Sequence, residues 1–517
     1  MFNDMGKSWK TYRKLHRWPG LIISFILLYY SLTGIIMNHR EWFAGVDFNR
    51  KIMPGNYMYR NWNNAAVRGN LIISSDSILI YGNIGVWSTD SAFKDYISVN
   101  TGFPGGSDNR RIYDLHRTPD GSLYAATLFG LYGYDSENRM WQKFATEGRE
   151  QRFTAIESIG DTVYAFNRSD LFIGISSGIK TSFIKKTLPP PTGFDNKITL
   201  FQTIWQIHSG EILGLPGKVY VDVLGIITIF LAITGITWFF FPGWIKRRVR
   251  QARESLHLRK TAKWSLRWHN KIGAWTFVLL ILLYLTGMFL RPPLLIAIGE
   301  SRVKPVRYSH LDQPNPWYDK LRDILFDPGK RIFLLAASDG IYHINPHDLV
   351  PVKYRIQPPV SVMGINVFKN LGTGTYLVGS FTGMFIWNPE SPEIFDFMTG
   401  EPYRQSPMGK PVGDYTITGL IEDTEKKLYP VDYEKGVISM KDEPSFPGMP
   451  ENIIRESKIS MWNLCLEIHT GRIYENIVGG FYILVVPLVG LTGITVVFSG
   501  YIVWRRKYRK QGYNNIV

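Results

Sequence analysis

The sequence is poor in the features that mark several common protein classes. Cys465 is the only cysteine among 517 residues, so the chain cannot form an internal disulfide or a zinc cluster of thiolates. A glycine-rich phosphate loop between a strand and a helix is also missing, because GFPGGSDN at 102–109 is typical of a turn. The sequence therefore predicts no nicotinamide or flavin domain of its own.

Charged residues are missing from four long apolar stretches. A helix needs about 20 residues to cross the hydrocarbon of a bilayer, and each stretch is close to or above that length. The first is too long for a signal peptide and no small-residue cleavage site follows it, so we interpret it as an anchor. The predicted transmembrane helices cover residues 18–38, 223–245, 272–290 and 476–504.

The excess of basic residues predicts the topology. The net charge is +16, and three stretches beside the apolar runs, 1–17, 246–271 and 505–517, carry 20 basic and 2 acidic residues. Basic flanks face the cytoplasm, so both termini and the central loop are expected there. The long segments 39–222 and 291–475 then lie outside the cytoplasm. This distribution argues against a nucleic-acid partner and for a lipid bilayer.

The two halves of the chain are a tandem duplication. LHRWPGLIISFILLYYSLTG pairs with WHNKIGAWTFVLLILLYLTG, and the returning spans follow IHSG and IHTG. Both halves have the same orientation, so a pseudo-two-fold axis would run along the membrane normal. We expect the Thr-Gly pairs to let helices approach closely. The matched positions are His16 with His269, Thr33-Gly34 with Thr286-Gly287, His208 with His469, and Thr234-Gly235 with Thr492-Gly493.

The two external segments carry a second repeat. Strand-like alternation interrupted by glycine recurs six times, three times in each segment, at spacings of about 40 to 50 residues. The pattern predicts an α + β membrane protein: four helices and a large antiparallel β region, with six blades closing one β-propeller. Two separate β domains are the alternative. The repeats are 79–90, 123–135, 163–176, 332–345, 376–388 and 428–442.

Histidines stand at the ends of the spans, in matched positions of the two halves. Under the pseudo-two-fold axis, His16 faces His269 at one depth on the cytoplasmic side, and His208 faces His469 on the outer side. Ionisable residues at membrane depth are functional candidates, and neutral imidazole is a common iron ligand. The two pairs predict two haems, each held between two imidazoles.

His39 breaks this symmetry, because its counterpart in the second half is Pro292. It is an alternative outer ligand in place of His208 or His469. The other reading of all these histidines is that they only meet lipid headgroups.

The same motifs resemble those of PepSY-associated transmembrane proteins, over the four helices and about a third of the chain. That family is linked to iron uptake and includes inner-membrane ferric-siderophore reductases with haem b. The resemblance implies electron transfer across the membrane to a periplasmic ferric chelate. Its haem ligands would be His16, His208, His269 and His469, with His39 as a further candidate. Typical members carry α/β PepSY modules outside the membrane, where this chain has propeller-like repeats.

The predicted function is therefore a haem-dependent electron conduit, supplied with electrons by a quinol or a separate reductase. The resemblance implies that it acts as a ferric siderophore reductase. Arg17, Arg267 and Arg472 stand beside the ligand candidates and are potential partners of haem propionates. A membrane-anchored propeller that binds a ligand or a partner protein is the alternative. A permease is a third reading, weakened by having only four spans.

Overall fold

The protein is described from a computed structural model, which covers residues 2–148, 150–361, 364–404, 413–440 and 445–509. The chain forms two compact units. The membrane unit holds residues up to Phe43, Asn196–Asp312 and the chain from Trp462 onward. The sheet unit holds Ala44–Asp195 and Gln313–Met461. Each unit is described by itself.

Four long helices make up the membrane unit: α1 (Phe2–Asn38), α3 (Gly214–Arg250), α4 (Leu256–Phe289) and α9 (Val485–Arg509). Within the described residues, four helical segments are long and apolar enough to cross a membrane. Large apolar side chains lie on the outside of the bundle, for example Ile22 at 67% and Leu32 at 53% exposure. Such an apolar exterior suits lipid, so the protein is a membrane protein.

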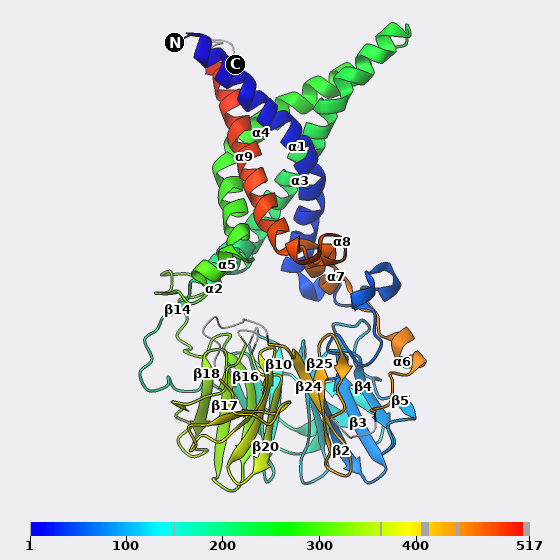
Figure 1. Cartoon of the computed structure of the whole chain (residues 1–517), viewed down its shortest axis with the longest axis vertical. Coiled ribbons are helices and arrows are strands. Elements are labelled where there is room, and N and C mark those ends of the chain that lie inside the picture. The colour runs from blue at the N-terminus through cyan, green and yellow to red at the C-terminus, as the bar shows by residue number, and fades with distance from the viewer. Residues whose placement is uncertain (1, 149, 362–363, 405–412, 441–444, 510–517) are drawn as a thin grey trace. The chain divides into compact units, whose positions relative to one another are not determined.

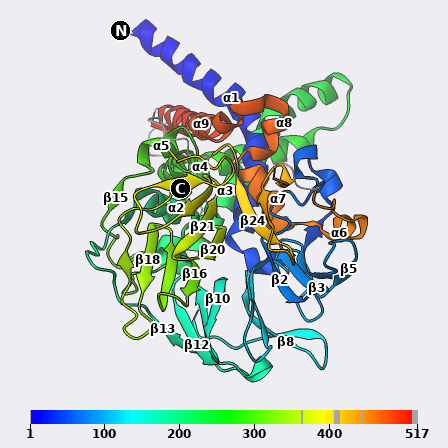
Figure 2. The same cartoon turned by 60° about the horizontal axis from the view of Figure 1, so that its bottom comes forward.

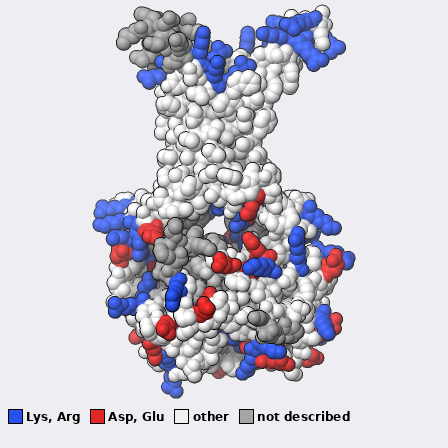
Figure 3. Space-filling model, in the orientation of Figure 1, with Lys and Arg blue, Asp and Glu red and all other residues white. Residues whose placement is uncertain are grey.

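The four helices pack in the cyclic order α1, α3, α4, α9, so α1 and α4 are diagonal to each other. The start of α1, the end of α9 and the turn between α3 and α4 lie at one end of the bundle (Figure 1). Lysine and arginine gather at that end, next to an uncharged band (Figure 3). This is the distribution that the positive-inside rule describes.

The helices extend beyond the predicted spans. α1 begins well before residue 18, α3 begins at Gly214 rather than 223, and α4 begins at Leu256 rather than 272. Helices continue into their polar flanks because lysine and arginine are good helix formers. The last span is interrupted: α8 (Glu475–Val478) and a 3-10 helix, η7 (Gly479–Leu484), precede α9.

Short elements complete the membrane unit. The helices α2 (Leu200–Ser209) and α7 (Met461–His469) precede the two returning spans, and α5 (Leu294–Ile298) follows α4. The strands β14 (Ile198–Thr199) and β15 (Arg302–Val303) pair with each other.

The sheet unit contains six antiparallel sheets, five of four strands and one of three. Two very short strands, β1 (Asp47–Phe48) and β27 (Ile459–Ser460), form a separate pair, and α6 (Glu451–Glu456) lies just before β27. The strands of the six sheets are β2 (Gly69–Ser74), β3 (Ser77–Gly82), β4 (Gly85–Thr89) and β5 (Tyr96–Ser98); β6 (Ile112–Arg117), β7 (Leu123–Thr127), β8 (Gly130–Asp135) and β9 (Met140–Lys143); β10 (Phe153–Ile159), β11 (Thr162–Asn167), β12 (Leu171–Ile175) and β13 (Ile184–Lys186); β16 (Leu321–Asp327), β17 (Ile332–Ala337), β18 (Gly340–Ile344) and β19 (Val352–Lys353); β20 (Val367–Gly372), β21 (Thr375–Ser380), β22 (Gly383–Trp387) and β23 (Ile394–Asp396); and β24 (Ile417–Glu422), β25 (Leu428–Asp432) and β26 (Gly436–Val437).

Each of the six predicted repeats corresponds to the second and third strands of one sheet. The repeat at 79–90, for example, spans the β3–β4 hairpin, and the one at 428–440 spans β25 and β26; the end of the last repeat, 441–442, lies outside the described residues. The predicted α + β membrane class with an antiparallel β region is confirmed by these sheets and the four helices.

The six sheets follow one another in a closed cycle (Figure 2). A separate hydrophobic cluster lies between each sheet and the next. The cluster that closes the cycle joins Trp87 of the first sheet to Ile421 and Val431 of the last. This cyclic order is what the hypothesis of a six-bladed propeller requires.

Residues 61–64, which precede β2, make backbone hydrogen bonds to the last sheet and so connect it to the first. The Val437 amide donates to the Asn61 carbonyl at 3.0 Å, and the Asn64 amide donates to the Tyr433 carbonyl at 2.6 Å. Segment 61–64 therefore runs beside the three-stranded sheet, along β26. The two ends of the β region are joined by backbone hydrogen bonds as well as by the apolar cluster.

Replacing Gly436 by alanine is expected to weaken this junction. Gly436 has φ +78°, and an added Cβ would lie 1.5 Å from the Asn61 carbonyl oxygen. Backbone strain and overpacking together predict a loss of roughly 2–5 kcal/mol of unfolding free energy. Thermal unfolding of the purified chain measures it. Gly372→Ala is the matched control, because its φ is +88° with open space around the new methyl; equal losses in the two variants would contradict the role of the junction.

Candidate histidine pairs in the membrane unit

The structure brings the four matched histidines together as two pairs. The ring centres of His16 and His269 lie 6.1 Å apart, and those of His208 and His469 lie 6.3 Å apart. His16 belongs to α1 and His269 to α4, so the first pair spans the diagonal of the bundle. We call this the inner pair and His208 with His469 the outer pair.

The outer pair is presented by two equivalent turns. His208 is in the last turn of α2, and His469 ends α7. Each is followed two residues later by a glycine in the left-handed region, Gly210 at φ +78° and Gly471 at φ +76°. Such a glycine ends a helix at low steric cost. The repeated IHSG and IHTG motifs are therefore helix stops that place a histidine at the same point in both halves.

Hydrogen bonds of the outer pair are also equivalent. Nδ1 of His469 lies 3.0 Å from the Tyr30 carbonyl and 3.1 Å from Thr33 Oγ1. Nδ1 of His208 lies 3.1 Å from the Leu283 carbonyl and 3.2 Å from Thr286 Oγ1. Because a carbonyl oxygen only accepts, Nδ1 carries the proton in both rings.

The inner pair uses the same nitrogen. Nδ1 of His16 lies 2.9 Å from the Val496 carbonyl. Nδ1 of His269 lies 3.0 Å from Thr234 Oγ1, whose own proton is donated to the Phe230 carbonyl at 2.8 Å. In each case Nδ1–H is again the donor. The Nε2 lone pair of a neutral ring is then left for another partner, which is how protein scaffolds orient histidine ligands.

Glycines make room for all four rings. An added Cβ would lie 3.2 Å from His469 Cε1 at Gly34 and 2.8 Å from His208 Cε1 at Gly287. At Gly235 it would lie 3.4 Å from His269 Cε1. Three of the repeated Thr-Gly pairs thus seat an imidazole of a neighbouring element, a more specific role than the close helix packing that we expected from the sequence.

The fourth Thr-Gly pair does not follow the symmetry. Gly493 packs against the ring of Tyr284, and His16 lies instead against Gly500, where a Cβ would be 2.6 Å from Cε1. Gly500 is seven residues further along the chain than Gly493. No repeated motif marks Gly500, so sequence comparison of the two halves missed it.

A cavity opens beside the inner pair. Its wall is formed by residues of α1, α3, α4 and α9. Besides His16 and His269, apolar and aromatic side chains dominate its wall, including Leu27, Leu231, Leu280, Tyr284 and Tyr501. This lining suits a large, flat, mainly apolar group with few polar atoms.

The spacing of both pairs fits a metal between two imidazoles. A metal–nitrogen bond of about 2 Å places the centres of two trans imidazoles roughly 6 Å apart. The observed 6.1 Å and 6.3 Å match this separation. Among the described residues, no group of three or more His, Cys, Asp or Glu side chains is placed to hold a bare metal ion. Two-coordinate pairs of this kind fit haem iron, whose macrocycle supplies the other ligands.

His39 has a different environment. Its Nε2 lies 2.6 Å from Asp222 Oδ2, and its ring stacks on Trp42 at 4.1 Å. Asp222 lies on α3, one residue before the predicted start of that span, which is why the sequence pattern did not connect the two. The structure thus engages His39 with a carboxylate and leaves the two matched pairs intact.

The three arginines considered as propionate partners also differ. Arg17 lies over the ring of Phe239 at 5.0 Å, and Arg267 is exposed. Arg472 donates from Nε to Oε2 of buried Glu467 at 2.9 Å and also pairs with Oε1. The charge of Arg472 is therefore neutralised within the chain.

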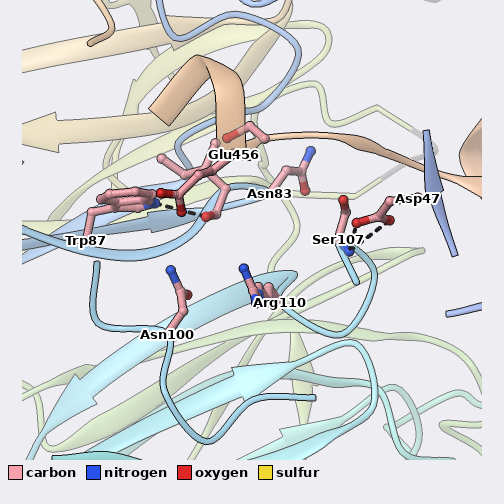
Figure 4. Close-up of a pocket in the computed structure, with 9 residues that line it drawn as sticks. Asp47, Asn83, Trp87, Asn100, Ser107, Arg110 and Glu456 are labelled. Carbon is pink, nitrogen blue, oxygen red and sulfur yellow. Dashed lines mark hydrogen bonds between the residues drawn. The ribbon is translucent and has the colours of Figure 1, made fainter. Parts of the chain in front are cut away.

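A second pocket lies in the sheet unit and is small and polar (Figure 4). Asp47 of β1 accepts twice from the Ser107 amide, at 3.0 Å each, and Asn100 accepts from the Val86 amide at 2.8 Å. These hydrogen bonds hold the loops around the β1–β27 pair. Arg110 lines the same pocket, and its buried Nε has no hydrogen bond to a described residue.

The comparisons with known proteins agree with the membrane unit. Residues 3–241 match the family described as PepSY-associated TM region. The match confirms, over residues 3–241, the resemblance to this family that the sequence motifs indicate. No curated protein matches the chain.

Solved structures give only remote likenesses. The extracellular domain of a hybrid two component system from B. thetaiotaomicron is 12% identical with a TM-score of 0.33, and the match covers 73% of this chain and 39% of that one. The N-terminal domain of Nup159 is 9% identical with a TM-score of 0.31, covering 70% and 72%. This chain thus spans well under half of the first structure, and neither likeness carries an argument about function.

Proposed function

We propose that the protein is a di-haem electron conduit that reduces a ferric chelate on the far side of the membrane from the cytoplasm. The observation that carries the proposal is the presence of two imidazole pairs, about 6 Å between ring centres. Every Nδ1 is hydrogen-bonded, and no Nε2 makes a hydrogen bond to a described residue. His16 and His269 would hold one haem, and His208 and His469 the other.

The chain's own residues set the conditions for electron transfer. Helix carbonyls and threonine hydroxyls fix each imidazole tautomer and orientation, and the apolar wall beside His16 and His269 excludes water. Haem b supplies a one-electron couple when bound. Each haem would be held by two histidines, and the substrate iron would then be reduced by electron transfer without binding to either haem.

The two pairs are separated along the bundle as a conduit requires. His16 and Thr33, which contacts His469, are 17 residues apart on α1. At a rise of about 1.5 Å per residue this is roughly 25 Å, most of the hydrocarbon thickness of a bilayer. One pair therefore belongs near each face of the membrane.

The basic end of the bundle supports the side assigned to each pair. Lysine and arginine favour the cytoplasmic face, which places His16 and His269 there. The membrane would be the bacterial inner membrane, with both termini cytoplasmic and the sheet unit in the periplasm. Electrons would enter from a quinol or a separate reductase, and the ferric chelate would be the substrate, as in siderophore reduction.

A second candidate function is ligand binding by a β-propeller, favoured by buried arginines of the sheet unit. Arg68 precedes the first strand of its sheet, as Arg152 does in the third sheet, and Arg322 is the second residue of β16. Nε of each is buried without a hydrogen bond to a described residue. Burial lowers the pKa of Arg322 to about 10. Such a cluster suits an anionic ligand or partner.

An absorption spectrum tests the proposed conduit. The full-length protein, purified in detergent from haem-replete cells, is recorded oxidised and then reduced with dithionite, and haem is counted by pyridine haemochrome. We expect a low-spin b-type spectrum and about two haems per chain. A colourless protein would overturn the conduit and favour the binding function.

A further inference from the structure

Two buried polar groups beside the outer histidine pair have no partner. Tyr30 is 8% exposed, and its hydroxyl makes no hydrogen bond to any described residue. Arg291 follows the end of α4, and its Nε is also buried without a hydrogen bond to any described residue. Buried polar atoms are rarely left unpaired, because the desolvation cost is not recovered.

Tyr30 ties these groups to the outer pair. Its carbonyl accepts the Nδ1 proton of His469 at 3.0 Å, and the two rings lie 5.4 Å apart between centres. Arg291 is close enough to Tyr30 for the two to interact electrostatically. The Tyr30 phenol therefore lies beside His469, and the charge of Arg291 acts on it.

The surroundings of Arg291 carry an excess of positive charge. Arg472 and Glu467 both act on Arg291, but both carboxylate oxygens of Glu467 are already taken by Arg472. Burial, and next the charge of Arg472, lower the pKa of Arg291. One more negative charge beside Arg291 would lower the electrostatic cost of burying its guanidinium.

We infer that Tyr30 and Arg291 form a carboxylate subsite beside the outer histidine pair, which binds an acidic side group of the haem held there. A guanidinium and a phenol hydroxyl are both donors, and charge-assisted bonds to a carboxylate are the strongest that such donors make. The inference rests on the proposed function and adds two residues that no histidine motif reveals. It also replaces Arg472, the sequence-based choice, by an arginine whose Nε has no hydrogen bond to a described residue.

The test compares haem with its dimethyl ester, whose acidic side groups are masked. A His16→Ala background restricts binding to the outer pair. In it, Arg291→Gln is compared with Arg307→Gln, an exposed control on the same unit. The readout is the rate at which bound haem is lost to an excess of apomyoglobin.

In the His16→Ala background, the ester should dissociate roughly ten-fold faster than haem. This ratio corresponds to the loss of one charged hydrogen bond. In the same His16→Ala background, Arg291→Gln should release haem about as fast as the protein without that substitution releases the ester. The ester should leave the Arg291→Gln variant no faster than haem does. Arg307→Gln should behave as the parent. Equal rates for haem and ester in the parent would overturn the subsite.

Two further outcomes are distinguishable. If the background protein takes up haem but Arg291→Gln does not accumulate, Tyr30→Phe carries the test, because it removes only the hydroxyl; an unchanged ratio of ester to haem rates would then overturn the inference. If no variant with an intact outer pair takes up haem, the proposed function fails together with the subsite.

Discussion

Replacing His469 by alanine is expected to remove one haem and leave the other. His469 and His208 form the outer pair, and an alanine leaves its iron with a single protein ligand. The inner pair uses other side chains at the far end of α1, so its haem should stay. We expect haem content to fall from about two to about one per chain, with a low-spin spectrum for the remainder.

His39→Ala is the matched control for this experiment. The sequence left His39 as an alternative outer ligand, whereas its Nε2 lies 2.6 Å from Asp222 in the structure. The variant should keep both haems. A loss of one haem from His39→Ala together with full retention in His469→Ala would contradict the assignment of the outer pair. The reciprocal variant, His16→Ala, should remove the inner haem only.

Lowering the pH from 8 to 5 is expected to stabilise the sheet unit. Burial raises the pKa of Glu157 to about 7 and that of Asp114 to about 6, and it raises the pKa of Asp323 well above its usual value. All three lie on first strands of successive sheets, and each acts on another through its charge. The folded protein therefore binds protons more tightly than the unfolded chain.

The sign follows from that difference. A carboxyl with a raised pKa in the folded state contributes stability below its unfolded pKa, and this contribution is lost as the pH rises through the folded pKa. For Glu157 the window runs from about 4.5 to about 7. A shift of this size corresponds to something on the order of 3 kcal/mol. The Phe326 amide, which donates to Glu157 at 3.0 Å, keeps its acceptor in either protonation state.

The measurement is the thermal midpoint of the full-length protein at pH 5 and pH 8. We expect the thermal midpoint of the parent to be higher at pH 5 than at pH 8. In Glu157→Gln this difference should be smaller, because the variant should be more stable than the parent at pH 8. Glu401→Gln, at an exposed position, should keep the parent's difference. A Glu157→Gln variant that keeps the parent's full difference between pH 5 and pH 8 would show that Glu157 is not held protonated by burial.

Much of the fold was predictable because it is encoded by local patterns. Uncharged runs of about 20 residues predict spanning helices wherever they occur. Alternation around glycine predicted the six hairpins, since a strand pair with a short turn is set by neighbours in sequence. The pairing of His16 with His269, and of His208 with His469, followed from duplication, which repeats each local motif at the same depth.

The details of the site were not predictable in this way. Nδ1 of His16 binds the Val496 carbonyl, 480 residues away, and Arg472 rather than Arg291 is paired with Glu467. Such contacts depend on how helices from both halves are rotated and shifted against each other. The 3-10 segment before α9 has no counterpart in α3. His16 packs against Gly500, two helical turns beyond Gly493, which is the glycine that the duplication matches to Gly235.

The sequence alone determined the number of spans, the β repeats and which histidines correspond, because each is written in a short stretch of chain. The tertiary structure decided which imidazole nitrogen is occupied and that His39 is held by Asp222. It also decided that the Tyr30 hydroxyl and Arg291 Nε have no hydrogen bond to a described residue. These outcomes depend on the burial and the satisfaction of polar groups from distant segments, and only the packed bundle brings those groups together.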